Sequence, residues 1–298
     1  MRKLLFIINP KSGAGSQAKV PALIDKVISK RDFLVEQRVV EAEGDVFRFG
    51  REAVEGGYYG VVAVGGDGTV NGVAAAVADT PVALGVVPCG SGNGLGHHLH
   101  VPMLVEGALE VINRDNVESF DYLTVNGRLC MCTCGMGFDA QVAYDFSQVW
   151  KRGFQTYLKT TLADYINFKP EDYVIELDDC LLKERAFVIA CCNAAQYGNN
   201  SFIAPHASMQ DGKIDVTIIS PFHVLQAPIV GLSLFLKLID KNHCVQGYRA
   251  REIKIRREKE GLMHIDGETV TMPAEVIVKC HPGGIKIFSP GKGENNKS

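Results

Sequence analysis

Short apolar runs recur through the first 125 residues, and each is followed by a glycine-rich or polar turn and then by a segment with helical spacing. This alternation is typical of a parallel β-sheet whose strands are joined by crossover helices. The runs that predict strands are rich in β-branched residues and cover 3–8, 34–40, 60–64 and 83–87. Helices are expected between them at 17–30, 45–55 and 71–78, which predicts a parallel sheet with helices on both faces.

Beyond about residue 125 this alternation stops. The segments 173–177, 186–192, 216–219, 252–256 and 276–279 read as strands of an antiparallel domain. Helical interruptions are expected at 142–167 and 223–241. The second of these is apolar enough to pack closely or to face a lipid, and core is the expected role for most of it. The length of the chain also favours two domains, at 1–125 and 126–298.

Composition is that of a folded globular protein, with 46% hydrophobic and 22% charged residues. A formal net charge of -3 provides no basic field for nucleic acid, which is therefore not an expected partner. No apolar run reaches the roughly 18 to 20 residues that span a bilayer, and no signal peptide is found.

Nine cysteines without an export signal read as reduced thiols of a cytoplasmic protein. Cys130, Cys132 and Cys134 alternate as on one strand face, and core packing is favoured over a metal site.

Three polar turns follow the first, third and fourth expected strands, at the end of the sheet where ligands of such folds bind. Glycines let backbone N–H groups approach a phosphate, and the helix after the second turn directs its positive end to the same place. Three such turns on one edge describe a crevice suited to a triphosphate. The candidate nucleotide-binding residues are Asn9, Pro10, Lys11, Ser12 and Gly13 in the first turn, Gly66, Asp67, Gly68, Thr69, Val70 and Asn71 in the second, and Ser91, Gly92 and Asn93 in the third.

In the second turn, the glycines alone do not explain the presence of Asp67. An acid among phosphate-binding amides repels the ligand unless a divalent cation stands between them, so Asp67 indicates Mg²⁺-nucleotide rather than free phosphate. The alternative is an Asp that caps a turn or a helix.

Taken together, the order and spacing of the three turns resemble the nucleotide-binding motifs of the diacylglycerol kinase and sphingosine kinase superfamily. The segments 205–216 and 266–268 resemble its carboxy-terminal signatures, so the likeness covers nearly the whole chain. The resemblance implies an α/β, Rossmann-like amino-terminal domain of the NAD kinase and diacylglycerol kinase type, a β-sandwich-type carboxy-terminal domain, and catalysis in the cleft between them. It also implies transfer of the γ-phosphate of ATP to a lipid hydroxyl.

The resemblance also carries roles for residues of the second domain. Glu268 corresponds to the general base that activates the lipid hydroxyl. Asp211, with main-chain carbonyls of Ser208 and Lys213, corresponds to a structural Mg²⁺ site of related bacterial lipid kinases. Asp139 lies where sphingosine kinases place an acid near the amino headgroup.

Each of these roles has a plain structural alternative. The residues before Glu268 read equally as an Asp-Gly hairpin turn followed by a solvated Glu. Asp211 also precedes a glycine, as in an ordinary turn, and Asp139 could be a helix N-cap. If the roles implied by the resemblance hold, Asp67 and Glu268 are the two candidate catalytic residues.

At two positions this chain departs from the family pattern, which limits the nucleotide contacts that the resemblance implies. Val40 stands where many bacterial relatives have Thr, and Gly72 stands where they often have Glu, so nucleotide contacts of those positions are not expected here. The third turn, followed by Gly94 and Leu95, is similar to the sphingosine kinase version, which tilts the expected acceptor towards a sphingoid base over diacylglycerol.

Two rival functions stay open. An NAD kinase-like enzyme would share the second turn, and a non-catalytic nucleotide- or lipid-binding protein could retain the fold. A lipid substrate implies work at the membrane surface by a protein that does not insert stably. A homodimer is compatible with the sequence.

Overall fold

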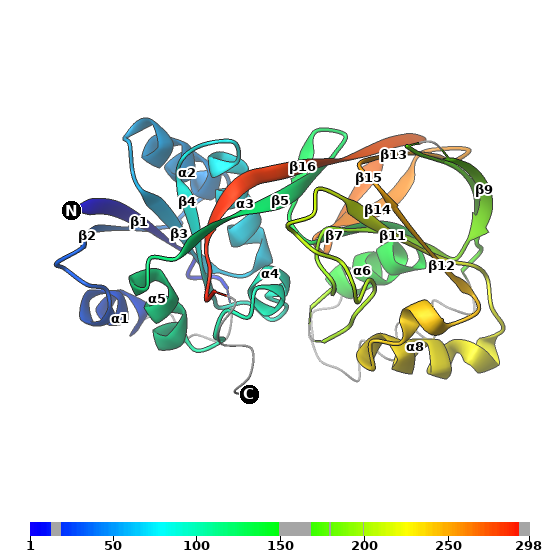
Figure 1. Ribbon diagram of the computed structural model, residues 1–298, viewed down its shortest axis with the longest axis horizontal. Helices are drawn as coiled ribbons and strands as arrows, with labels where there is room; N and C mark the ends of the chain where they lie inside the picture. Colours follow the sequence, from blue (N-terminus) through cyan, green and yellow to red (C-terminus); the bar gives the residue numbers. More distant parts are fainter. Residues whose placement is uncertain (13–18, 149–167, 179, 199, 292–298) are drawn as a thin grey trace. The chain divides into compact units, whose positions relative to one another are not determined.

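The computed structural model describes residues 1–12, 19–148, 168–178, 180–198 and 200–291 (Figure 1). Its contacts divide the chain into two compact units. The first contains Met1–Tyr122 and the chain from Pro282 onward, and the second contains Leu123–His281. The sequence prediction assigned all of 126–298 to the second domain. The end of the chain returns to the first unit because Lys286 and Ile287 of strand β16 pair with strand β4.

The first unit is built on a parallel sheet in the order β2-β1-β3-β4. The strands span Arg2–Ile8 (β1), Phe33–Val39 (β2), Gly60–Gly65 (β3) and Ala83–Pro88 (β4). All residues of β3 and β4 are buried, which explains why these strands appear in the sequence as unbroken apolar runs. The four strands lie within one residue of the predicted bounds at either end.

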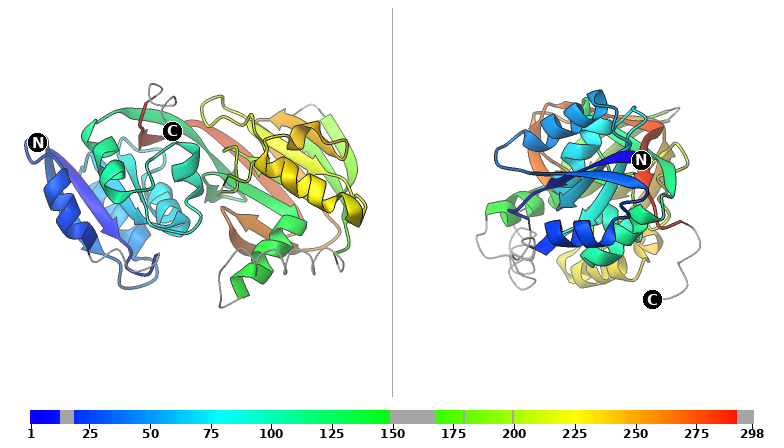
Figure 2. Two further views of the ribbon diagram at one scale, coloured as in Figure 1. Left: turned by 90° about the horizontal axis from the view of Figure 1, so that it is seen from below. Right: turned by 90° about the vertical axis from the view of Figure 1, so that its left-hand side faces the viewer.

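Helices cover both faces of this sheet (Figure 2). Helix α1 (Val20–Val27) packs with α5 (Val105–Asn113) on one face, and α2 (Asp45–Glu55) packs with α3 (Asp67–Val77) on the other. A short helix, α4, spans Gly94–His98. Helix α2 has the predicted bounds, whereas α3 begins four residues before its prediction, at the second glycine-rich turn. That difference places the N-terminus of α3 in the candidate site.

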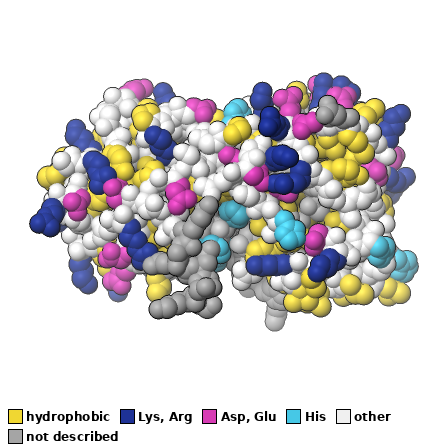
Figure 3. Space-filling view, in the orientation of Figure 1, with side chains coloured by type: hydrophobic (Ala, Val, Ile, Leu, Met, Phe, Trp, Pro, Cys, Tyr) yellow, Lys and Arg dark blue, Asp and Glu magenta, His cyan; other side chains and the backbone are white. Residues whose placement is uncertain are grey.

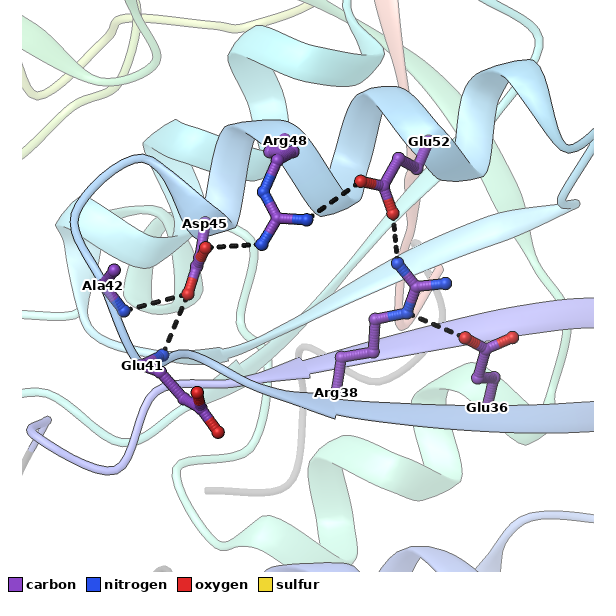
Figure 4. A network of polar contacts seen from close by, with 7 residues as sticks. All are labelled: Glu36, Arg38, Glu41, Ala42, Asp45, Arg48 and Glu52. Atoms are coloured by element: carbon purple, nitrogen blue, oxygen red, sulfur yellow. Dashed lines mark hydrogen bonds and ion pairs between the residues drawn. The ribbon is translucent and has the colours of Figure 1, made fainter.

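A line of charged side chains joins β2 to α2 (Figure 4). Arg38 donates to Glu36 over 2.8 Å and also pairs with Glu52, and Glu52 accepts a second bond from Arg48 over 3.0 Å. Arg48 in turn donates to Asp45 over 2.6 Å. Exposed ion pairs of this kind stabilise a fold little one by one, and here they connect a strand to the helix beside it.

Asp45 also fixes the turn that leads into α2. Its carboxylate accepts the backbone N–H groups of Glu41 at 3.0 Å and Ala42 at 2.9 Å. The hydrogen bond from Arg48, followed by these two backbone bonds, lowers the pKa of Asp45 to about 2. The carboxylate is therefore ionised under all ordinary conditions.

The second unit is a β-sandwich. One sheet has the order β12-β11-β10-β7-β14-β15, and strands β16, β13, β8 and β9 lie side by side in the other. Side chains of both sheets, such as Ile189 on one and Ile253 on the other, share a single core. The bounds are Val117–Val125 (β5), Arg128–Cys130 (β6), Thr133–Gly137 (β7), Glu171–Leu177 (β8), Cys180–Ala186 (β9), Val188–Cys192 (β10), Ile214–Ile219 (β11), Val245–Ala250 (β12), Glu252–Arg256 (β13), Gly261–Ile265 (β14), Glu268–Met272 (β15) and Glu275–Phe288 (β16).

Cys130, Cys132 and Cys134, whose alternation suggested one strand face, do not share one strand. Cys130 ends β6 and Cys134 lies on β7, and both are buried in the sandwich core together with Cys191. Their thiols contact one another, and the pKa of Cys134 is raised well above its ordinary value by the two neighbouring thiols and by burial. These residues act as core side chains.

Helix α6 (Phe138–Gln148) and helix α8 (Ala227–Phe235) complete the second unit, with 3₁₀ turns at Val224–Gln226 and Ile239–Lys241 beside α8. The predicted helix at 142–167 is found only in its first part, because 149–167 lie outside the described residues. The expectation that 223–241 is mostly core is wrong. Within α8 only Val230 and Ser233 are buried. Across the described part of the chain, no helix is long and apolar enough to span a bilayer.

Candidate functional site

The first and second turns are joined by Asn9, which directly follows β1. Its backbone N–H donates to the carbonyl of Val64 at 3.0 Å, and its side-chain Nδ2 donates to Oγ1 of Thr69 at 3.1 Å. The same side chain accepts the N–H of Lys11 through Oδ1 at 3.1 Å. Lys11 and Pro10 are exposed on this turn, and Gly13 lies outside the described residues. The structure thus brings two segments 60 residues apart into direct contact.

The second and third turns are joined by Asp67, the first residue of α3. Its Oδ2 accepts the backbone N–H of Asn93 at 2.9 Å, and its Oδ1 accepts the N–H of Gly94 at 2.7 Å. These two bonds are those of an acid that holds a turn, and the turn belongs to a segment 26 residues away. A role of Asp67 towards a divalent cation stays a prediction.

The third turn is held in shape by Asn93, whose backbone is left-handed with a φ of 50°. Its side chain accepts the N–H of Gly90 at 2.9 Å and donates to the carbonyl of Gly90 at 2.8 Å. A Cβ on Gly90 would lie 2.6 Å from the Cα of Gly66. Glycine is therefore required at position 90, because the backbone of one turn lies directly against the backbone of the other.

These contacts place the N-terminus of α3 and three glycine-rich segments in one compact group. The first N–H groups of a helix have no partner within the helix and attract anions. Gly68 and Ser91 are exposed at this place, whereas Val70 is buried and its side chain packs in the core. Of the predicted phosphate-binding residues, the described ones are brought together, with Val70 in a packing role.

Cys89 precedes the third turn, and its N–H donates to the carbonyl of Gly65 at 2.8 Å. Burial raises the pKa of its thiol. Because the thiolate is the reactive form, this raised pKa lowers the reactivity of the cysteine at neutral pH.

Glu268 follows a two-residue hairpin loop between β14 and β15. Both loop residues have left-handed backbones, with φ of 50° at Asp266 and 83° at Gly267, as a type I′ turn requires. Glu268 pairs in register with Ile265 and is exposed. The hairpin alternative therefore describes the backbone correctly, and the carboxylate of Glu268 lies on the surface of its unit.

Asp266 fastens this hairpin to the strand beside it. Its carboxylate accepts the N–H groups of Met131 and Cys132, both at 2.7 Å, and of Thr133 at 3.0 Å. Burial raises the pKa of Asp266, and these three bonds act in the opposite direction. This role could not be predicted from the sequence, because the partners are more than 130 residues away.

Asp139 stands in the first turn of α6 within a group of polar side chains. Its Oδ2 accepts the hydroxyl of Tyr197 at 2.9 Å and lies 3.1 Å from Nε2 of His264, and its Oδ1 accepts the N–H of Ala140 at 2.7 Å. The side chain of Asp139 is 13% exposed. His264 is buried, and among the described residues its Nδ1 has no hydrogen-bond partner. Tyr197 and His264 were not found from the sequence.

Asp211 lies in an acidic pair balanced by an arginine. One oxygen accepts the N–H of Lys213 at 3.0 Å, and the other pairs with Arg249. Arg249 also lies 3.3 Å from Asp215, whose pKa is raised chiefly by burial. Oxygen donors of this kind suit Mg²⁺. In this structure the Arg249 guanidinium supplies the positive charge beside Asp211. The Mg²⁺ site formed with the carbonyls of Ser208 and Lys213 stays a prediction.

No group of three or more His, Cys, Asp or Glu side chains that could hold a metal ion occurs in the described ranges. Mg²⁺ that arrives with a nucleotide does not need such a group, because phosphates and water supply most of its ligands.

A parallel α/β unit with glycine-rich turns, encoded together with a β-sandwich unit, defines the diacylglycerol kinase-like class of folds. A family model of the diacylglycerol kinase catalytic domain matches residues 3–125, and a model of the YegS C-terminal NAD kinase β-sandwich-like domain matches residues 132–289. The chain belongs to the lipid kinase family that combines these two domains.

Known proteins agree with this assignment. A protein of Xanthomonas oryzae pv. oryzae named "Probable lipid kinase YegS-like" is 30% identical over 88% of this chain and 89% of its own length. An uncharacterized protein of Synechocystis sp. is 31% identical over 77% of this chain, and the match spans 54% of that protein, about half its length. The crystal structure of a diacylglycerol kinase from Bacillus anthracis shares the fold, with a TM-score of 0.76 at 18% identity over 97% of both chains.

Proposed function

We propose that this protein is an ATP-dependent lipid kinase that transfers the γ-phosphate of ATP to a hydroxyl of a lipid, either diacylglycerol-like or a sphingoid base. The observation that carries the proposal is the interlock of the three turns through Asn9, Asp67 and Gly90. Catalysis of phosphoryl transfer is mainly positioning and electrostatic stabilisation, which a prearranged set of backbone N–H donors supplies. Family membership supplies the class of acceptor.

The residues of the first unit bind and orient the nucleotide. The N-terminus of α3 and the glycine-rich turns hold the phosphates, and Lys11 adds positive charge from the exposed first turn. Asp67 is a positioning residue, since it holds Asn93 and Gly94 in place. Mg²⁺ bound with the nucleotide neutralises phosphate charge.

Glu268 provides the base in this proposal. The lipid oxygen forms a bond to the γ-phosphorus while the bond from that phosphorus to the bridging oxygen of ADP breaks, and the hydroxyl proton passes to the carboxylate of Glu268. The hydrogen bonds from the N–H groups of residues 131–133 to Asp266 fix the hairpin that carries the carboxylate of Glu268. A base on a fixed hairpin needs no rearrangement before it accepts the proton.

The surroundings of Asp139 bear on the choice of lipid. Both of its oxygens already accept hydrogen bonds, and little of its side chain is exposed. These contacts weigh against direct pairing of Asp139 with the ammonium group of a sphingoid base. They do not weigh against a neutral acceptor such as diacylglycerol.

The test is transfer of labelled γ-phosphate from Mg-ATP to diacylglycerol, sphingosine, dihydrosphingosine and ceramide in mixed micelles, with NAD and buffer as further acceptors. We expect a labelled lipid. Glu268→Gln should lower turnover by about 100-fold or more and leave Mg-ATP affinity unchanged. Glu258→Gln, at an exposed position before β14, is the matched control and should behave as wild type.

Two results would overturn the proposal. Labelled NADP as the product would assign the protein to the NAD kinases. ATP binding without transfer to any acceptor would favour a non-catalytic binding protein.

A further inference from the structure

The surface of the second unit carries a concentration of exposed apolar side chains. Seven of the sixteen large hydrophobic residues that are exposed in the described ranges lie on α8 and the turns beside it. Leu225 is 78% exposed, Ile229 66% and Leu232 57%. Figure 3 shows hydrophobic side chains gathered where α8 lies. We call this surface the α8 face, which consists of Val224, Leu225, Ile229, Leu232, Phe235, Leu236 and Leu238.

The spacing of these residues shows that they form one stripe. Ile229 and Leu232 are three residues apart and lie on one side of α8. Leu225, in the 3₁₀ turn before α8, and Leu236, directly after α8, continue the spacing of three and four residues. Val230, on the other side, packs into the core beneath the sheet. Helix α8 is therefore apolar on both its inner and its outer side. A helix on a water-exposed surface normally has a polar outer side, so an apolar one indicates a partner that is itself apolar.

The charges around the α8 face have one dominant sign. No Asp or Glu occurs from residue 216 to residue 239. Lys237 lies two residues after the end of α8 with its Nζ 4.3 Å from the ring centre of Phe202, and Lys241 is exposed in the following 3₁₀ turn. The carboxylate beside them, Asp240, lies 3.4 Å from His206. An apolar stripe with lysines at its edge matches the chemistry of an anionic bilayer surface.

We propose that the α8 face docks on the surface of an anionic lipid bilayer. Its apolar side chains enter the boundary between headgroups and acyl chains, and Lys237 and Lys241 meet the headgroups. Helix α8 has nine residues, far fewer than a bilayer span requires, so it lies in the plane of the surface. This inference rests on the proposed function, which places the substrate in a bilayer.

A second copy of the chain is the other candidate occupant. In a two-fold contact the same patch faces itself, so the lysines at the edge of one copy would approach those of the other. The cationic edge therefore favours a lipid surface.

The test measures binding to vesicles of phosphatidylcholine mixed with phosphatidylglycerol, and of phosphatidylcholine alone, by sedimentation. The triple variant Leu225→Gln, Ile229→Gln, Leu232→Gln should bind the mixed vesicles at least about 10-fold more weakly. The matched control is Leu34→Gln, Phe47→Gln, Leu104→Gln in the first unit, where the exposed fractions are 52%, 48% and 79%. It should bind as wild type. Melting temperatures close to that of the wild type establish that both variants are folded.

The lysines are tested separately. Lys237→Gln and Lys241→Gln should each weaken binding to the mixed vesicles by about fivefold at low salt, and should have little effect on phosphatidylcholine alone. Equal losses on both kinds of vesicle would contradict the assigned role of the two charges.

A soluble acceptor separates docking from catalysis. Short-chain diacylglycerol, dissolved as monomers, should be phosphorylated equally by the wild type and the triple variant, while phosphorylation of diacylglycerol in vesicles falls in the variant. Wild-type vesicle binding by the triple variant would overturn the inference and leave the kinase proposal intact. Binding through the α8 face without transfer to any lipid would overturn the kinase proposal and retain the docking surface. A wild-type dimer that the triple variant abolishes, with vesicle binding unchanged, would assign the face to a second copy and overturn the inference.

Discussion

Each unit contains a polar centre. In the first unit it consists of the three turns around Asp67 and Gly90 and is built largely from backbone groups. In the second unit it consists of Asp139 and its neighbours and is built from side chains. The N–H groups of Asn93 and Gly94 bond to Asp67, and Gly90 lies against another glycine. Around Asp139, by contrast, Tyr197 and His264 supply the contacts. A backbone-built centre depends on the path of the chain, so one added carbon can displace several donors together. A side-chain centre loses one contact at a time.

The sharpest test of this difference is Gly90→Ala. The new Cβ would lie 2.6 Å from a backbone Cα, and neither backbone can move aside as a flexible side chain could. Displaced turns should weaken Mg-ATP binding by about 100-fold or more, measured by calorimetry. Gly247→Ala, with nothing within 4 Å of its Cβ, should bind normally. Unchanged affinity in Gly90→Ala would show that these turns do not hold the nucleotide.

Asp67→Asn should have the next largest effect. The amide keeps one acceptor oxygen, but its NH₂ group faces an N–H that formerly donated to the carboxylate. Loss of one such contact should weaken Mg-ATP binding by about 10-fold. Asp172→Asn, at an exposed position on β8, serves as the control. Faster amide exchange at Asn93 and Gly94 would link the loss to the third turn, and exchange as in the wild type would count against the positioning role.

Tyr197→Phe should have a smaller and more selective effect. It removes one hydrogen bond to Asp139 and leaves His264 in place. The KM for the lipid should rise by about fivefold, while Mg-ATP affinity stays the same. Tyr248→Phe, which removes a bond to Gln246, is the matched control. Equal losses for lipid and nucleotide would indicate a general structural defect instead.

The smallest effect is expected from Asp45→Asn, which lies outside both centres. The folded-state pKa of about 2 is below the ordinary value of 3.8, so the carboxylate stabilises the fold at pH values above about 4. That contribution is lost as the pH falls through 2. The melting temperature of the variant should therefore be slightly lower than that of the wild type at neutral pH, and the difference should disappear towards pH 2. A difference that persists at pH 2 would contradict this origin.

The sequence predicted the first unit better than the second for a physical reason. Parallel strands such as β3 and β4 are buried on both faces, so they appear as unbroken apolar runs, and glycine turns must follow them within a few residues. The partners of Asp139 lie 58 and 125 residues away, and only the folded chain brings them together. Neither the spacing of residues nor composition predicts contacts between side chains so far apart in the sequence.

The α8 face shows a second limit. Hydrophobicity in 223–241 indicates that this segment avoids water, but it does not identify what covers it. The sequence favoured the protein core, and the structure instead leaves Leu225, Ile229 and Leu232 exposed. The same pattern fits both outcomes, because a bilayer and a protein interior are apolar alike.

The return of strand β16 to β4 also has a consequence for synthesis of the chain. Lys286 and Ile287 emerge from the ribosome after all of the second unit, so one edge of β4 stays without this partner while about two thirds of the chain is still being made. In chain order the second unit is an insertion within the first. A fragment that ends at residue 125 would retain its glycine-rich turns but leave a bare parallel edge, a template for aggregation.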